Sequence, residues 1–172
     1  AWTLTASGYD SGSPDAGTYP LSEVGPANYT QTSLTCSNSG TAQVTSVTLG
    51  LGEDVTCTFV NNDDAPSLTL VKEVVNDNGG TLDASTVTLI ATGPTEFSGF
   101  GPSVSNGASF DAGSYDLSES PVPGYTASDW VCVGGTQDDE NTVTIGLGQD
   151  ITCTITNDDI APTLKLVKVV EN

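Results

Sequence analysis

The sequence contains no histidine, arginine or methionine, and lysine occurs only three times. Against 22 acidic residues this leaves a formal net charge of −19 at pH 7, which excludes a nucleic-acid-binding surface and disfavours attraction to anionic lipid. The absence of histidine also removes the commonest neutral-pH acid or base and the commonest metal ligand. No nucleophile elbow or phosphate loop is present either. We therefore expect a protein that is not a turnover enzyme and that needs no cofactor.

Long apolar runs are also missing from the chain. No segment approaches the roughly 18 consecutive apolar residues that span a bilayer, so no membrane insertion is expected. No signal peptide or sorting motif is recognisable, as in a mature or excised chain. Serine, threonine and 19 glycines are abundant instead, a composition typical of short strands with polar outer faces joined by tight turns. The composition therefore predicts an all-β protein.

An internal repeat organises the chain. Residues 16–66 return at 112–162 with a constant offset of 96 and with 22 of 51 positions identical. The segment 65–76 then returns at 161–172 with the same offset. Because self-similarity at a fixed period indicates copies of one structural unit, the chain is predicted to hold two copies of one domain.

The two copies are not equally complete. A full copy begins with a strand-like segment at Leu68, whereas copy one begins with Trp2–Gly8, which matches the later segment Val87–Gly93. A segment of the missing first type, Leu164–Val170, stands alone at the end of the chain. The expected parts are a β-sandwich domain without its first strand (1–66), a complete β-sandwich domain (67–160) and a spare first strand (161–172). The spare strand either is donated to another subunit or begins a further repeat of a longer array.

Within each copy the apolar residues alternate with polar ones, which is the period of a half-buried strand. The inward faces of the last strands are predicted to hold Val55, Cys57, Phe59 and Asn61 in copy one and Ile151, Cys153, Ile155 and Asn157 in copy two. A second alternating strand places Glu23 after Tyr19 and Leu21, and Glu119 after Tyr115 and Leu117, on the same inward side. Short alternating strands at this spacing indicate tandem, Ig-like antiparallel β-sandwich domains.

The four cysteines form two equivalent pairs, Cys36 with Cys57 and Cys132 with Cys153, each with a separation of 21. Because the repeat duplicates the pair, disulfides within each domain are favoured over the other two connectivities. Zinc would need closer cysteine pairs or added histidines. Disulfides in turn indicate an oxidising, extracellular or cell-surface location.

One lysine, one glutamate and one asparagine recur at fixed places in the repeat. If Leu68 and Leu70 point inward, so does Lys72, and the core then holds Lys72, Glu119 and Asn157 together. Burial favours the uncharged forms of an amine and a carboxylic acid. A neutral amine can attack the asparagine amide while the glutamate relays protons, which leaves an isopeptide bond and ammonia.

At these residues the chain resembles the prealbumin-like B-type repeat domains of bacterial surface adhesins and major pilins. The resemblance rests on three motifs: the LxLxK segment Leu68–Lys72, the YxLxE segment Tyr115–Glu119 with its following PxGY, and the terminal TxTN segment Thr154–Asn157. It implies a prealbumin-like β-sandwich and an autocatalytic isopeptide bond between Lys72 and Asn157, promoted by Glu119. The paired cysteines and the WxC at Trp130 depart from the commonest pattern and look like a disulfide-bearing branch.

A simpler interpretation remains open at these three residues. Lys72 can extend its ammonium group to solvent, Glu119 can lie on the rim, and Asn157 can belong to the turn that follows. Val71 and Val75 are also apolar, so the opposite face of the first strand is an alternative inner face.

The same positions in copy one predict a contact between subunits. Glu23 and Asn61 are present, but the matching lysine is Lys168 in the spare strand. A strand of this kind can complete the open sheet of another copy, which is the donor-strand form of β-augmentation. Such a head-to-tail contact does not close, so it builds a fibre of identical subunits. An isopeptide bond from Lys168 to Asn61, promoted by Glu23, would make that fibre covalent.

A competing class is a binding module, such as an adhesin or a calcium-dependent recognition domain cut from a longer tandem-repeat surface protein. Calcium favours oxygen-rich loops, and acidic turns occur at residues 61–64, 76–78, 138–140 and 157–159. None of them has the spacing of a complete calcium loop. The segment 94–111 is 11 residues longer than its counterpart in copy one and carries Phe97 and Phe100, so it is the candidate binding insertion.

Overall fold

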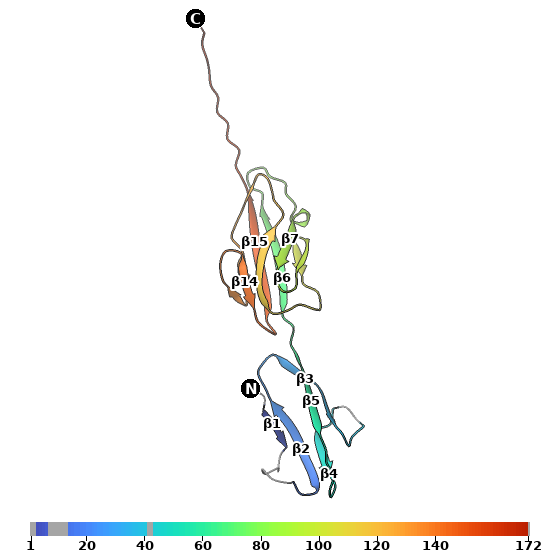
Figure 1. Cartoon of the computed structure of the whole chain (residues 1–172). Helices are drawn as coiled ribbons and strands as arrows, with labels where there is room; N and C mark the ends of the chain where they lie inside the picture. The colour runs from blue at the N-terminus through green and yellow to red at the C-terminus, as the bar shows by residue number, and fades with distance from the viewer. Residues whose placement is uncertain (1–2, 7–13, 41–42, 172) are drawn as a thin grey trace. The chain divides into compact units, whose positions relative to one another are not determined.

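The computed structural model describes residues 3–6, 14–40 and 43–171. The chain divides into two compact units, Ala1–Asp64 and Ala65–Asn172, and each is built from strands (Figure 1). The first predicted segment of copy one is Trp2–Gly8. Three of its residues, Trp2, Ser7 and Gly8, lie outside the described residues. In the described ranges, no helix has the length and apolar character that crossing a lipid bilayer requires. The predicted all-β class is confirmed.

Unit 1 consists of two small sheets. Its strands are β1 (Thr3–Ala6), β2 (Gly17–Val24), β3 (Tyr29–Cys36), β4 (Ser46–Leu49) and β5 (Cys57–Asp63). Strand β2 lies between β1 and β4, while β3 pairs with β5 in a separate two-stranded sheet. The second edge of β5 has no strand beside it among the described residues, so this edge carries unpaired backbone groups.

Unit 2 is a complete sandwich of two sheets. Its strands are β6 (Ser67–Val75), β7 (Thr88–Thr92), β8 (Phe97–Phe100), β9 (Ser103–Ser105), β10 (Gly113–Glu119), β11 (Tyr125–Ala127), β12 (Val131–Val133), β13 (Thr136–Gln137), β14 (Thr142–Ile145) and β15 (Asp150–Asp159), with a 3-10 turn at Ala84–Thr86. One sheet has the order β13-β14-β10-β7-β8; the other has the order β11-β15-β6-β9, and β12 also pairs with β15.

Strands β6 and β15 pair in parallel, while the other described pairings are antiparallel. The register places Ser67 beside Asp150 at one end and Val75 beside Asp158 at the other. The chain therefore enters unit 2 at one end of this ladder and leaves it at the opposite end.

The core of unit 2 lies between its two sheets and follows the predicted alternation. In β15 the inward residues Ile151, Cys153, Ile155 and Asn157 are at most 4% exposed. In β6, Leu68 and Leu70 are fully buried, whereas Val71 is half-buried and Val75 is exposed. The face of β6 that carries the two leucines is thus the inner one.

The longer segment of copy two closes one side of the sandwich. Strand β8 pairs with β7 in one sheet, and β9 pairs with β6 in the other. Phe97 packs edge-on against Phe110 with ring centroids 5.7 Å apart, and Phe110 stacks on Tyr115 at 4.7 Å. Phe100 is 68% exposed. Most of the candidate binding insertion is therefore part of the sandwich itself.

Both predicted disulfides are present. Cys36 on β3 bonds Cys57 on β5, and Cys132 on β12 bonds Cys153 on β15, with directly opposed residues in each pair. With a sequence separation of 21 in each loop, each bond contributes about 3 kcal/mol of stability. The bond between Cys36 and Cys57 crosses the two-stranded sheet of β3 and β5. Isolated two-stranded sheets are marginally stable, so this sheet depends on its disulfide more than the larger sheets of unit 2 do.

Candidate functional site

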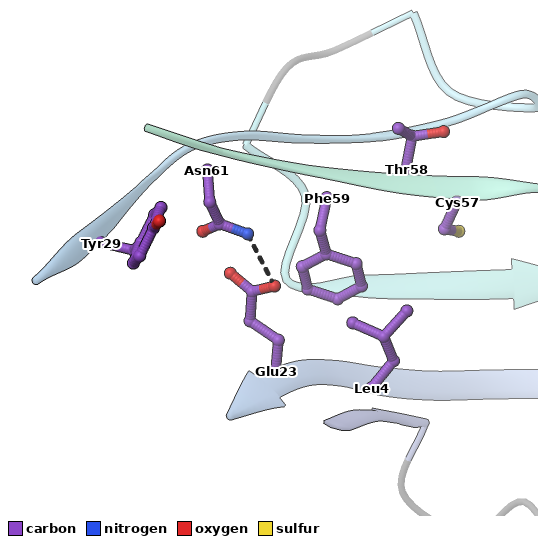
Figure 2. A pocket seen from close by; sticks show the side chains of 7 residues that line it. All are labelled: Leu4, Glu23, Tyr29, Cys57, Thr58, Phe59 and Asn61. Atoms are coloured by element: carbon purple, nitrogen blue, oxygen red, sulfur yellow. Dashed lines mark hydrogen bonds between the residues drawn. The ribbon is translucent and has the colours of Figure 1, made fainter. Parts of the chain in front are cut away.

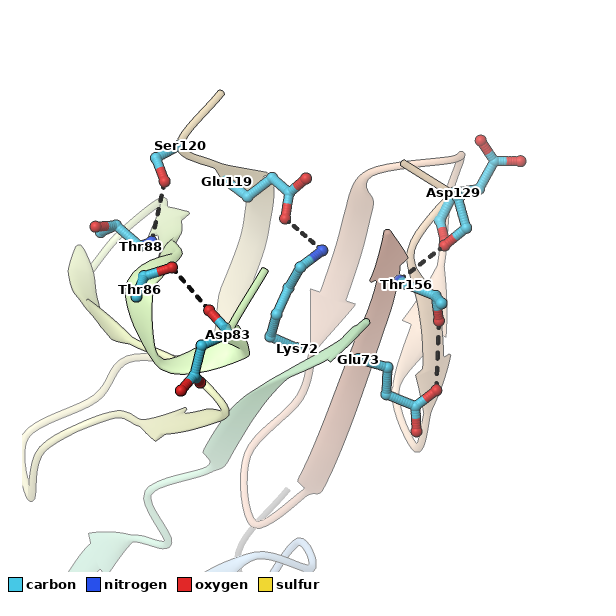
Figure 3. Close-up of polar contacts among 10 residues, drawn as sticks. Lys72, Glu73, Asp83, Thr86, Thr88, Glu119, Ser120, Asp129 and Thr156 are labelled. Atoms are coloured by element: carbon cyan, nitrogen blue, oxygen red, sulfur yellow. Dashed lines mark hydrogen bonds and ion pairs between the residues drawn. The ribbon is translucent and has the colours of Figure 1, made fainter. Parts of the chain in front are cut away.

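A buried ion pair joins the two sheets of unit 2. Lys72 comes from β6 and is 2% exposed, and Glu119 comes from the end of β10 in the facing sheet. The Nζ atom of Lys72 lies 2.7 Å from Oε2 of Glu119. Figure 3 draws this ion pair as a dashed line. Two opposite charges at this distance inside a protein attract strongly, so the pair fixes the lysine side chain in the core.

Asn157 lies on the strand next to Lys72 and faces the same interior. The parallel register places Lys72 beside Ile155 and Val74 beside Asn157, so Asn157 lies two residues beyond the partner of Lys72 on the neighbouring strand. Asn157 is 1% exposed, and its Oδ1 atom has no hydrogen-bond partner within the described part of the chain. A buried carbonyl without a partner costs about 1–3 kcal/mol. The three predicted residues of copy two therefore share one region of the core.

Unit 1 assembles the equivalent glutamate and asparagine without a lysine. The Nδ2 atom of Asn61 donates a hydrogen bond of 3.0 Å to Oε2 of Glu23. Figure 2 shows this pair beside a cavity. The cavity has a volume of about 580 Å³ and is lined by Leu4, Glu23, Tyr29, Cys57, Thr58, Phe59 and Asn61. Residues 1–64, which form unit 1, contain no lysine.

The cavity lies where unit 2 has its first strand. Cys57, Phe59 and Asn61 on β5 are half-buried, whereas their counterparts on β15 are buried beside β6. Leu4 is 61% exposed, while its counterpart Leu89 is fully buried. A second hollow of about 230 Å³ continues the opening and is lined by Pro14, Tyr19, Leu21, Val47, Leu49, Val55 and Cys57. We call these two adjoining hollows the open groove of unit 1.

The residues that would fit this groove lie exposed at the end of the chain. Residues 160–171 form no strand. Leu164 and Leu166 are each 86% exposed, although Leu68 and Leu70, the matching residues of β6, are fully buried. Lys168 matches Lys72. The spare segment thus carries the inward pattern of a first strand and pairs with no strand in the described part of the chain.

Asp159 holds the loop that follows β6. Its carboxylate accepts hydrogen bonds from the backbone N–H groups of Asp77, Asn78 and Gly80. Sequence reasoning missed this role, although Asp159 and its counterpart Asp63 are identical in the two copies. Asp77 and Asp158 bring carboxylate oxygens within 4.8 Å of it. Because the Asp159 oxygens already accept several N–H groups, they are poorly placed to act as calcium ligands as well.

The stability of unit 2 is expected to fall in acid through Asp159. Burial favours the neutral acid, but the N–H groups of Gly80, Asn78 and Asp77 outweigh this and lower the pKa of Asp159 from 3.8. A carboxyl with a lowered folded-state pKa stabilises the fold above its unfolded pKa, and this stabilisation is lost as pH falls through the folded value. Thermal unfolding from pH 7 to pH 2 should show a shallower acid decline for Asp159→Asn than for the wild type. Parallel declines would contradict this role.

The fold and the candidate sites together define a class of protein: tandem two-sheet β-domains with one disulfide in each domain, the second of which has a buried lysine–glutamate pair between its sheets. The chain belongs to the prealbumin-like fold domain family, which it matches over residues 1–59 and 63–155. The family predicted from the sequence motifs is thereby confirmed. A comparison with curated proteins found no match.

Solved structures of major pilins from Streptococcus pyogenes are similar to this chain. The T-13 pilin is 18% identical, with a TM-score of 0.40, and the match covers 87% of this chain and 69% of the pilin. The T3.2 pilin is 17% identical, with a TM-score of 0.42 and coverages of 86% and 69%. A further major pilin is 16% identical, with a TM-score of 0.39 and coverages of 86% and 71%.

Proposed function

We propose that this chain is the structural subunit of a bacterial cell-surface filament, joined head to tail by donor-strand complementation. The spare strand of one copy, residues 161–172, fills the open groove of unit 1 (residues 1–66) in the next copy. The complete domain between them, residues 67–160, separates successive joints. The observation that carries this proposal is the match between a groove missing its first strand and an exposed segment with the pattern of that strand.

The repeat also defines how the strand would dock. Shifting the β6–β15 register by 96 residues places Leu164 opposite Val55, Leu166 opposite Cys57 and Lys168 opposite Phe59. Leu164 and Leu166 would then enter the groove, and burial of a leucine side chain contributes about 1.5–3 kcal/mol. The free edge of β5 would gain the backbone hydrogen bonds of a parallel ladder.

The direction of the chain favours extension into a filament. Because the ladder of β6 and β15 is parallel, the donor segment leaves unit 2 at the end opposite to the one that follows unit 1. A contact between two different surfaces of identical subunits need not close and generates filaments. Two disulfides suit an oxidising, extracellular setting for such a filament.

We further propose that lysine–asparagine isopeptide bonds reinforce the subunit. In unit 2, Glu119 takes a proton from Lys72, and the neutral amine attacks the side-chain carbonyl of Asn157. The asparagine C–N bond breaks, and its nitrogen leaves as ammonia with one hydrogen of the amine, which Glu119 relays. At the joint, Lys168 of one copy would react with Asn61 of the next, with Glu23 as the promoting residue. Each site reacts once, so the protein is not a turnover enzyme.

The intact mass of reduced, boiled protein tests these proposals. Each bond should lower the mass by about 17 Da through the loss of ammonia, and joints should give a ladder of multiples of the 17.5 kDa chain. Lys72→Ala should restore the full mass within a subunit without removing the ladder, whereas Lys168→Ala should remove the ladder alone. A chain that stays monomeric in native buffer and unchanged in mass would contradict the filament and both bonds, and would favour a repeat pair within a longer array.

A further inference from the structure

The outer edge of β6 is covered in unit 2 by the segment that follows β8. Strand β9 pairs with Thr69–Val71 of β6. On either side of this ladder, the amide of Leu68 donates to Oδ1 of Asn106 at 2.6 Å, and the amide of Lys72 donates to the carbonyl oxygen of Pro102 at 2.8 Å. The backbone groups on this edge of the first strand are therefore paired along its inner length.

The described part of copy one contains no counterpart of β9 beside β5, and the sequence of copy one is shorter at this place. The 18 residues of segment 94–111 correspond to the seven residues 9–15. Strands β8 and β9 with their turn occupy residues 97–105, which is more chain than seven residues provide. A donor strand docked in unit 1 would thus leave its outer edge unpaired, and an unpaired edge is a template for pairing with another strand.

The spare strand differs from β6 at this edge. Thr69 contacts β9 through a 2.8 Å hydrogen bond between its Oγ1 atom and Oγ of Ser105. Its counterpart in the spare strand is Lys165. Since Leu164 and Leu166 take the inward positions, Lys165 would lie on the outer face of the docked strand. The chain has three lysines; two occupy the cross-linking position of the repeat, and the third occurs at this edge.

We propose that Lys165 keeps the joints of neighbouring filaments from pairing edge to edge. This inference rests on the proposed donor-strand joint. Charged side chains on edge strands, lysine above all, are a common means by which natural sheets avoid such pairing. When two identical edges approach in antiparallel fashion, like charges also come opposite each other, which destabilises the pairing. The residue therefore specifies end-to-end growth over lateral association.

The experiment compares filaments of the wild type, Lys165→Thr and Lys165→Glu in the same buffer. Lys165→Thr introduces the residue that β6 has at this position, Thr69. It should at least double the fraction of protein that pellets at low speed, and electron micrographs should show wider bundles. This variant is one charge more acidic, so a change in net repulsion alone predicts the opposite result. Lys165→Glu keeps a charge at the edge and should leave the filaments single.

The outcomes separate the two proposals. The role of Lys165 is overturned if the filaments of all three proteins have the same width and pellet equally. It is also overturned if Lys165→Thr bundles less than the wild type. Either result leaves the donor-strand joint intact. If all three proteins sediment only as the 17.5 kDa chain, the joint itself fails, and the role of Lys165 fails with it.

Discussion

Replacing Leu166 with aspartate is expected to abolish filament formation while leaving unit 2 folded. Leu166 is 86% exposed in the free chain, but in the proposed joint it takes the place of Leu70, which is fully buried. The substitution removes the burial of a leucine and forces an unpaired carboxylate into an apolar groove. Together these terms exceed about 3 kcal/mol, so the joint should weaken by at least about 100-fold. Sedimentation velocity at fixed concentration measures this loss.

The neighbouring residue provides a matched control. Val167 is 72% exposed in the free chain, and alternation places it on the outer face of the docked strand. Val167→Asp makes the same change in charge one position away, yet it should still form filaments. Thermal unfolding of unit 2 should be unchanged in both variants because neither side chain packs against it. Equal effects of the two substitutions would show that the segment does not dock with its leucines inward.

Several features of the fold could be predicted because the internal repeat and the alternation along each strand are visible in the sequence itself. Alternation along β15 identified the inward residues Ile151, Cys153 and Ile155, and duplication of the cysteine pair identified both disulfides. The alternation in β6 allows two inward faces, since Val71 and Val75 form a second apolar face. Packing against the opposite sheet decides between the two faces, and the sequence of one strand does not contain that information.

Other features depend on how distant strands meet. The parallel pairing of β6 with β15 was not predicted, because a period of two is the same in parallel and antiparallel strands. The longer segment of copy two is the candidate insertion of the alternative binding-module hypothesis, and in the structure it closes the sandwich because β8 and β9 join different sheets. The role of Asp159 depends on a loop 79 residues earlier in the chain. Contacts between segments that are far apart in the sequence leave no periodic pattern in it.

The buried pair in unit 2 should make the domain intolerant of a change in one partner alone. Glu119→Ala leaves the Lys72 ammonium group, in a residue 2% exposed, without a counter-charge. Removing one partner of a buried ion pair costs about 3–5 kcal/mol, which corresponds to a fall in Tm of at least about 12 °C for a domain of this size. The variant should also keep its full mass, because no carboxylate remains to relay protons. Differential scanning calorimetry and intact mass check the two effects.

A double variant separates the ion pair from the proposed bond. Replacing both charges with apolar residues of similar volume, Lys72→Met with Glu119→Leu, removes the unpaired charge, and such replacements are often neutral or stabilising. The double variant should therefore be more stable than Glu119→Ala. Its Tm should still be lower than that of the wild type. The proposed isopeptide bond would link β6 to β15 in the wild type and would reduce the conformational entropy of the unfolded chain. A double variant with the wild-type Tm would mean that no covalent bond adds to the stability of the wild type. This result would contradict the bond between Lys72 and Asn157.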